Sequence, residues 1–245
     1  MAKHAPPSPR AGQDHTRVQK SVLSVLERRA LLWIAARTPA WVTPDTYTGV
    51  GIVASAVILL GYALTALDKG YLWLASAGFF LHWLGDSMDG TLARYRKIER
   101  PRYGFFVDHI LDVVGVTLIF IGLGLSPFMR FDVAMMALVA FLLVTIYVYL
   151  TTAVNGVFTI SYAGLGPTET RVLAVLANTV FFFVDIPSLR VFGYEVTFLE
   201  IVAGIVGIGC GAIFIIASVR TARGLSHADR AALREKLSRG KAGRT

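Results

Sequence analysis

Four aspartates stand at helical spacing around a short polar segment between apolar stretches of the chain. Asp86 and Asp89 are three residues apart, so they share one face of a helix, and Asp108 and Asp112, four apart, share another. Ionised carboxylates at membrane depth cost about 2.5–3.5 kcal/mol each on insertion scales and repel one another, so this group needs positive partners. Oxygen ligands without clustered His or Cys favour a hard divalent cation over zinc. The pattern predicts that all four bind Mg²⁺ or Mn²⁺, ions that commonly hold phosphates.

Other interpretations of these acids stay open. They could pair with the basic residues of the same hairpin, which are Arg94, Arg96, Lys97, Arg100 and Arg102. Intramembrane acids also mark ion pathways, so an ion-coupled transporter is the alternative from another functional class. A transporter is expected to scatter its acids over several helices and to contain an inverted repeat, and this sequence has neither feature. A structural scaffold leaves the four carboxylates unexplained, so we favour an enzyme.

The composition indicates which elements position these residues. With 55% hydrophobic and 16% charged residues and a mean hydropathy of +0.60, the chain is too apolar for a water-soluble domain. Apolar stretches near the length that crosses a bilayer as a helix predict an all-α integral membrane protein with six transmembrane helices. The second stretch is short, so we extend it to Tyr95 as one helix that emerges from the membrane. The predicted spans are Tyr47–Leu67, Tyr71–Gly85 with this extension, Phe105–Leu125, Val133–Val154, Val172–Ile186 and Val196–Val219.

Segments of different character flank the predicted spans. Residues 1–16 contain little apolar content and are expected to form a disordered cytosolic tail. Residues 17–38 alternate apolar and basic side chains near helical spacing, which predicts an amphipathic helix at the membrane surface. Residues 43–219 form the predicted six-helix membrane domain, and residues 220–245 a basic cytosolic tail.

The charge distribution predicts an orientation. The formal net charge is +8, and under the six-span topology 21 of the 24 basic residues fall on one side. The other side holds only Lys69, Arg130 and Arg190. Because basic loops stay in the cytoplasm, both termini and the aspartates are predicted on the cytoplasmic side. The basic residues border apolar spans, so we expect contact with lipid headgroups and no binding of nucleic acid.

Read together, Asp86-x2-Asp89-Gly90-x2-Ala93-Arg94-x9-Gly104-x3-Asp108-x3-Asp112 resembles the signature of the CDP-alcohol phosphotransferase family of membrane enzymes. The resemblance implies a site for two Mg²⁺ or Mn²⁺ ions formed by the four aspartates, and a homodimer. It also implies a nucleotide held by Asp86, Gly90, Ala93 and Arg94, with Asp112 as general base. In this chain nine residues separate Arg94 from Gly104, whereas the family usually has eight in this interval. Thr48 follows a Thr-Pro-Asp turn where many members carry Pro-Asn before a Thr near the nucleotide.

The resemblance implies metal-dependent transfer of a phosphoalcohol group from a CDP-linked donor to a hydroxyl acceptor, with release of CMP. His109 after Asp108 and the stretch Gly166-Pro167-Thr168-Glu169 are similar to the choline and ethanolamine phosphotransferase branch, which favours a CDP-amino-alcohol donor and a lipid acceptor. The alternative is a phosphatidyltransferase that uses CDP-diacylglycerol and a small polar alcohol. An imidazole can also accept the hydroxyl proton, so His109 and Asp112 both remain candidates for the base.

For residues outside this hairpin, the sequence gives weaker evidence of a functional role. Thr168, Glu169 and Arg171 are candidates for contact with the acceptor or headgroup, although the last two could equally cap a helix. His82 lies on an apolar face, and its expected role is packing. Cys210 is the only cysteine of the chain, so an intrachain disulfide is excluded and its expected role is also packing.

Overall fold

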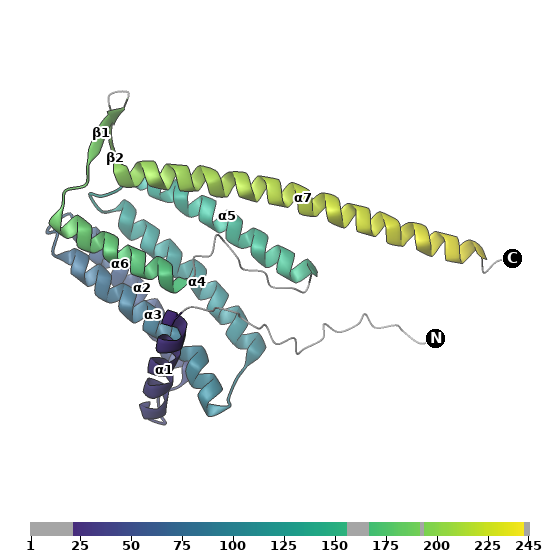
Figure 1. Cartoon of the computed structure of the whole chain (residues 1–245), viewed down its shortest axis with the longest axis horizontal. Coiled ribbons are helices and arrows are strands. Elements are labelled where there is room, and N and C mark those ends of the chain that lie inside the picture. The colour runs from purple at the N-terminus through teal and green to yellow at the C-terminus, as the bar shows by residue number, and fades with distance from the viewer. Residues whose placement is uncertain (1–21, 156–166, 192–193, 243–245) are drawn as a thin grey trace. The chain divides into compact units, whose positions relative to one another are not determined.

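The computed structural model of the chain describes residues 22–155, 167–191 and 194–242 (Figure 1). These residues are almost entirely helical, as the sequence predicts, apart from one β-hairpin. The helices are α1 (Val22–Arg37), α2 (Pro44–Leu64), α3 (Tyr71–Arg96), α4 (Pro101–Gly124), α5 (Phe131–Asn155), α6 (Pro167–Phe183) and α7 (Phe198–Ala242). The strands are β1 (Ser188–Val191) and β2 (Tyr194–Thr197). The predicted tail at residues 1–16 and the first residues of the predicted surface helix lie outside the described residues.

Four helices of the described chain are long and apolar enough to cross a membrane: α2, α4, α5 over Phe131–Val154 and α7 over Phe198–Arg234. The chain is therefore an integral membrane protein whose described residues are mainly helical. The other two predicted spans correspond to α3, whose second half is polar, and to α6, which has 17 residues. Six crossings remain a prediction, as does the surface location of α1.

The chain divides into two compact units. In the described chain, the smaller unit contains residues 139–155 and 205–242, where the Tyr147 hydroxyl lies 2.8 Å from the Thr221 hydroxyl and joins α5 to α7. The larger unit contains residues 22–138, 167–191 and 194–204. All four aspartates of the candidate site belong to this larger unit.

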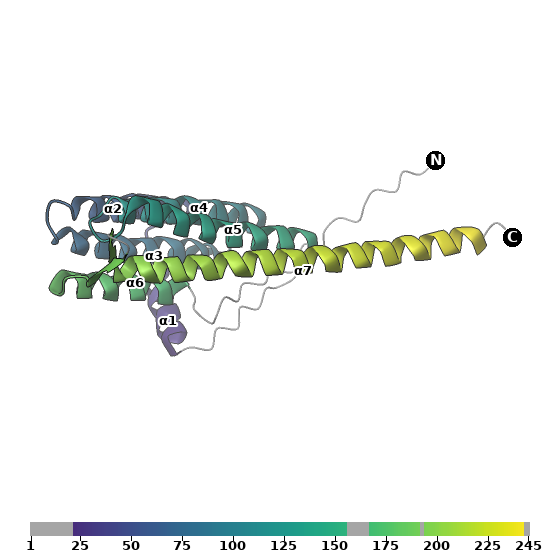
Figure 2. The same cartoon turned by 90° about the horizontal axis from the view of Figure 1, so that it is seen from above.

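Helix α2 is the centre of the larger unit and contacts both α3 and α4. Glycines permit this close approach, because a Cβ atom at Gly61 would lie 2.5 Å from the Ala75 backbone nitrogen of α3. On the other side, a Cβ atom at Gly122 of α4 would lie 2.6 Å from the Leu59 Cα of α2. Helix α6 packs on α3, as the two views in Figures 1 and 2 show.

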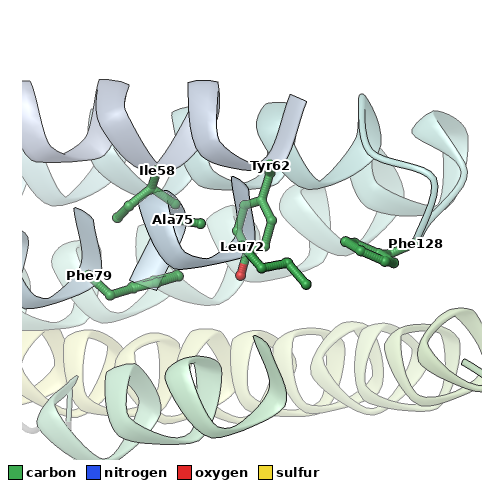
Figure 3. Close-up of a cluster of buried hydrophobic side chains, with 6 residues drawn as sticks. All are labelled: Ile58, Tyr62, Leu72, Ala75, Phe79 and Phe128. Atoms are coloured by element: carbon green, nitrogen blue, oxygen red, sulfur yellow. The ribbon is translucent and has the colours of Figure 1, made fainter. Parts of the chain in front are cut away.

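A hydrophobic cluster fills the space between α2, α3 and the α4–α5 turn (Figure 3). Its buried members are Ile58, Tyr62, Leu72, Ala75, Phe79 and Phe128. The Tyr62 hydroxyl leaves this cluster and donates a hydrogen bond to Asn178 Oδ1 of α6, at 3.0 Å. Asn178 Nδ2 in turn donates to the Ser76 hydroxyl of α3, at 3.2 Å. These buried hydrogen bonds fix the register of α6 on α2 and α3, because a shift along the helix would leave their polar atoms unpaired.

Helix α1 packs on the second half of α3. Leu31 and Ala35 form a buried cluster with Met88 and Leu92, and the Trp83 indole donates a hydrogen bond to Glu27 Oε1 at 2.8 Å. The opposite face of α1 exposes apolar and basic side chains, including Leu32, Trp33, Arg28 and Arg29. This composition suits a lipid headgroup region, since aromatic and basic side chains favour membrane interfaces.

The start of α2 is fixed by a capping box. Thr43 is the N-cap, its hydroxyl accepts from the Thr46 backbone, and Pro44 occupies the first turn. Asp45 forms an ion pair with Arg100, which ties this turn to the α3–α4 loop. Asp45 thus has a structural partner in the turn before α2.

Two predicted span boundaries differ from the observed helices. The predicted Val172–Ile186 span is α6, which begins five residues earlier because Pro167 suits a first helical turn. The predicted Val196–Val219 span is α7, which begins at Phe198 and continues through the basic segment to Ala242. Residues just before it pair as an antiparallel hairpin from Ser188↔Thr197 to Val191↔Tyr194, which the sequence analysis did not predict.

Candidate active site

The two aspartates of α3 follow a close approach of α3 to α2 at Gly85. A Cβ atom at Gly85 would lie 2.6 Å from the Gly51 backbone nitrogen and 2.7 Å from the Tyr47 carbonyl oxygen. Real Cβ atoms do not approach so closely, so Gly85 serves helix packing. This contact sets Asp86, the next residue, beside α2.

All four aspartates line one cavity, which we call the aspartate cavity. Its volume is about 30 Å³, enough for a water or a metal ion but not for a nucleotide. The lining residues come from α2, α3 and α4 and are Thr48, Gly51, Ile52, Ser55, His82, Asp86, Asp89, Asp108, Leu111 and Asp112. Helix α2 forms one wall of the cavity, and α3 and α4, which carry the aspartates, form the others. The four carboxylates are therefore brought together by α2 as well as by the α3–α4 hairpin.

Asp86 forms an ion pair with Arg171 of α6. The distance from Arg171 Nη2 to Asp86 Oδ2 is 2.8 Å, and the two side chains are 14% and 27% exposed. An ion pair shielded to this degree is screened less by water and salt than a surface pair. Arg171, predicted as an acceptor or headgroup residue, therefore directly contacts a predicted metal ligand.

Asp89 is held by hydrogen bonds from two groups. The Thr48 hydroxyl donates to Asp89 Oδ2 at 3.1 Å, and the Gly90 backbone N–H donates to Asp89 Oδ1. The same hydroxyl lies 3.2 Å from the Pro44 carbonyl oxygen, one turn earlier in α2. Thr48, predicted near the nucleotide, thus orients a carboxylate and lines the aspartate cavity.

On α4, Asp108 and Asp112 line the cavity, whereas His109 is not among its lining residues. His109 Nδ1 lies 2.8 Å from the Phe105 carbonyl oxygen and 3.5 Å from Asp108 Oδ2, and its ring stacks on Phe105. A neutral imidazole that donates from Nδ1 to the carbonyl keeps Nε2 as its proton acceptor. Asp112 is an exposed carboxylate at the cavity wall.

The other signature residues continue along α3 beyond the cavity. Gly90 and Ala93 lie four and seven residues after Asp86, on the same helical face. Arg94 is exposed, and its guanidinium donates to the Thr91 hydroxyl at 3.4 Å. A Cβ atom at Gly90 would meet only this flexible guanidinium, at 3.1 Å.

Gly104 of α4 differs from the packing glycines. Apart from its chain neighbours and the backbone of its own helix turn, none of the described residues has an atom within 4 Å of a Cβ atom built there. Helix packing therefore does not explain the small residue at this position. Open space next to Gly104 is what a ligand approaching the backbone requires.

The start of α6 contains the other predicted acceptor residues. Thr168 and Glu169 are partly buried in its first turn. Glu169 Oε2 is buried, and none of the described residues forms a hydrogen bond with it. An unsatisfied buried carboxylate oxygen is costly, so this atom is a candidate for contact with a group that the structure does not contain.

Two polar residues of the cavity, His82 and Ser55, were missed as site residues in the sequence. His82, expected to pack, lines the cavity, and its buried Nδ1 has no hydrogen-bond partner among the described residues. Ser55 faces it near Gly115, where a Cβ atom would lie 3.0 Å from the Ser55 hydroxyl and 3.2 Å from His82 Nε2. The available signal was helical spacing: His82 precedes Asp86 by four residues, and Ser55 follows Thr48 by seven.

The donor chemistry of the cavity fits a hard divalent cation, since the four carboxylates supply only oxygen. Among the residues that the structure describes, however, no three acidic, His or Cys side chains are grouped closely enough to hold a metal ion. The contacts above give a physical reason. Asp86 is turned to Arg171, and Asp89 to Thr48, so binding of an ion requires these side chains to reorient.

Several proteins of known activity resemble the chain over part of its length. Cholinephosphotransferase 1 of Xenopus laevis is 33% identical over 98 residues, which cover 38% of this chain and 24% of that protein. Cholinephosphotransferase 1 of Danio rerio is 32% identical over 96 residues, 37% of this chain and 25% of that protein. Phosphatidylinositol phosphate synthase of Cutibacterium acnes is 36% identical over 87 residues, 35% of this chain and 39% of that protein. The chain thus spans a quarter to two fifths of the length of these relatives.

The family comparison extends further along the chain. Residues 41–215 match the model of the CDP-alcohol phosphatidyltransferase family. This match includes α2, α3, α4 and α6, and with them every described residue of the aspartate cavity. Because it covers well over half of the chain, the chain belongs to the CDP-alcohol phosphatidyltransferase family, a family of transferases.

Proposed function

We propose that this protein transfers a phosphoalcohol group from a CDP-linked donor to a hydroxyl acceptor, with release of CMP, in phospholipid biosynthesis. The observation that carries the proposal is the aspartate cavity, which all four signature carboxylates line in the larger unit. Membership of a transferase family favours this activity over the ion-coupled transporter considered from the sequence.

In this proposal Asp86, Asp89, Asp108 and Asp112 hold two Mg²⁺ or Mn²⁺ ions, as the resemblance to the family signature implies. The metal would neutralise the pyrophosphate of the donor and improve CMP as a leaving group. Gly90, Ala93 and Gly104 would allow the nucleotide close to the backbone, and the free face of Gly104 supports this role. Arg94 is exposed beside Gly90 and would pair with a donor phosphate.

The acceptor hydroxyl must lose a proton as it attacks phosphorus, and the chain offers two bases. Asp112 lines the aspartate cavity, and His109 does not. We therefore propose Asp112 as the base and His109 as a residue that positions Asp108, whose Oδ2 lies 3.5 Å from the imidazole. A normal pH–rate profile for His109→Ala, at reduced or unchanged rate, would agree with this assignment.

For the donor, we propose a CDP-amino-alcohol such as CDP-choline or CDP-ethanolamine, with a lipid hydroxyl as acceptor. The Asp108-His109 pair, the Gly166–Glu169 stretch and the similarity to two cholinephosphotransferases support this choice. The second candidate is transfer of a phosphatidyl group from CDP-diacylglycerol to a small polar alcohol. The 36% identity to a phosphatidylinositol phosphate synthase favours that candidate.

We propose six membrane crossings, with α3 and α6 added to the four apolar helices. At 1.5 Å per residue, the 26 residues of α3 reach about 39 Å and the 17 of α6 about 25 Å, close to the hydrocarbon thickness of about 30 Å. Six crossings put both termini and the Arg94–Arg102 loop on one side, which the basic residues make cytoplasmic. Cysteine labelling from either side of the membrane at positions 99 and 190 tests this topology.

We also propose a homodimer, as the family resemblance implies. Large apolar side chains such as Ile110 and Val114 of α4 are exposed in the single chain, and they face either lipid or a second copy. Chemical cross-linking in native membranes, followed by mass determination in detergent, distinguishes these arrangements.

The test of the function is CMP release by the purified protein with Mg²⁺ or Mn²⁺. CDP-choline, CDP-ethanolamine and CDP-diacylglycerol are offered separately, each with matched acceptor pools. CMP from the CDP-amino-alcohols alone supports the preferred donor, and CMP from CDP-diacylglycerol alone establishes the second candidate. If no CDP-linked donor yields CMP under these conditions, the proposed reaction is wrong.

A further inference from the structure

The ion pair between Asp86 and Arg171 places a fixed positive charge at the aspartate cavity. Asp86 lines the cavity on α3, and Arg171 reaches it from α6 with an N–O distance of 2.8 Å. The Arg171 side chain is only 14% exposed, so the guanidinium is held in a defined position. It offsets part of the repulsion among the neighbouring carboxylates.

We infer that Arg171 is a built-in substitute for the divalent cation: it holds Asp86 in the metal-free protein and must leave when the cation binds. This inference rests on the proposed function, which gives Asp86 the role of a metal ligand. Mg²⁺ binds carboxylate oxygens at about 2.0–2.1 Å. The guanidinium lies on Asp86 Oδ2, so a cation that binds this oxygen competes with Arg171 and is repelled by it, and Arg171 then has to move.

The remaining contacts of α6 allow this exchange without release of the helix. Asn178 lies seven residues after Arg171, two turns along the same face, and its hydrogen bonds with Tyr62 and Ser76 are independent of the ion pair. The buried Asn178 contacts therefore anchor α6 while the Arg171 side chain changes partner. Displacement of Arg171 is a side-chain movement at one end of an anchored helix.

Two buried polar atoms without hydrogen-bond partners among the described residues belong to residues near Asp86 and Arg171 in the sequence. His82 Nδ1, one turn before Asp86, and Glu169 Oε2, two residues before Arg171, are both buried without a hydrogen-bond partner among the described residues. Native interiors rarely leave such atoms unpaired. Their presence close to the ion pair supports a rearrangement of these side chains when a cation binds.

The first experiment follows Arg171 in the wild-type protein. Purified protein is treated with phenylglyoxal with and without Mn²⁺, in the absence of any nucleotide, and modification of each arginine is measured by mass spectrometry. Mn²⁺ binding is measured in the same samples by electron paramagnetic resonance. We expect Mn²⁺ to increase the modification rate of Arg171, while that of Arg190, an exposed arginine of the hairpin, stays constant.

The second experiment uses Arg171→Gln and the matched control Arg190→Gln, which removes the same charge from a weak 3.9 Å pair with Glu195. Because Asp86 no longer has a competing cation, Arg171→Gln is expected to bind Mn²⁺ about tenfold more tightly than wild type. Arg190→Gln is expected to bind it as wild type does. Circular dichroism establishes that both variants remain helical.

The inference is overturned if Mn²⁺ binds and Arg171 modification stays unchanged, whatever the affinity of the variant. It is also overturned if wild type releases CMP but binds no Mn²⁺, or if Arg171→Gln remains helical and binds Mn²⁺ no more tightly. CMP release by wild type separates these failures from failure of the proposed function. Absence of both CMP release and Mn²⁺ binding overturns both proposals.

Discussion

Replacing Gly85 with alanine should separate α3 from α2 and disturb the cavity without touching a carboxylate. The new Cβ atom would lie 2.6 Å from the Gly51 nitrogen and 2.7 Å from the Tyr47 oxygen, both backbone atoms that cannot rotate away. Overpacking of this kind costs about 1–3 kcal/mol, and the better helix propensity of alanine returns up to about 1 kcal/mol. A net loss of about 1–2 kcal/mol corresponds to a decrease in Tm of about 2–8 °C for a domain of this size.

Gly104→Ala is the matched control, since it makes the same change in α4 where no described residue beyond the adjoining helix turn has an atom within 4 Å of the new Cβ. Its Tm should stay constant or rise slightly, because only the helix propensity changes. If the nucleotide approaches Gly104, however, the methyl group should raise KM for the CDP-linked donor by about tenfold, equivalent to about 1.4 kcal/mol. The two glycines thus separate a packing role from a binding role.

The assay is thermal unfolding of each purified variant in detergent, together with CMP release as a function of donor concentration. An unchanged Tm for Gly85→Ala would refute the close helix approach. A Gly104→Ala protein with wild-type KM would refute a nucleotide beside Gly104. A lower Tm for Gly104→Ala would mean that protein occupies the space beside Gly104 in the assembled enzyme.

Other variants test single residues of the site and its supports. Asp89→Ala and Asp112→Asn should each abolish CMP release while the protein still inserts and purifies, and normal turnover in either one contradicts its assignment. His109→Ala should lower the rate without abolishing it, because the residue lies outside the cavity wall; a complete loss with intact Mn²⁺ binding would instead make the imidazole the base. His82→Leu should leave Tm within about 3 °C of wild type, since it removes a buried nitrogen that has no partner among the described residues. Lys97→Gly should raise Tm by a few degrees, because Lys97 ends α3 in the left-handed conformation, φ 57°, where a non-glycine residue costs about 1 kcal/mol; an unchanged or lower Tm argues that the lysine side chain has a compensating contact.

Much of the helical architecture follows from local sequence. Apolar stretches predict α2, α4 and α5 to within a few residues, and α3 runs as one helix through the polar segment, as expected. The signals are strong because a spanning helix must be long, apolar and internally hydrogen-bonded. Capping residues define helix ends more closely than hydropathy does, as Thr43 and Pro44 do at the start of α2.

Elements that depend on weaker signals were harder to predict. The hairpin of β1 and β2 has only four residues in each strand, too few for the alternation of apolar and polar residues to stand out. Helix α7 continues past the apolar stretch because residues such as Ala231, Leu233 and Arg234 favour helix even when exposed. Hydropathy indicates where a helix leaves the membrane, and a helix can continue beyond that point.

The carboxylates of the site were predictable, but their partners were not. Spacing within one helix gives the Asp86–Asp89 and Asp108–Asp112 pairs, because three and four residues return to the same face. The Asp86–Arg171 contact instead depends on the register of α6 against α3, which buried hydrogen bonds at Asn178 determine. Those bonds join residues more than a hundred positions apart in the sequence, so no local pattern contains them. The sequence therefore indicates the chemistry of the candidate site, whereas the contact between Asp86 and Arg171 depends on how α6 packs on α3.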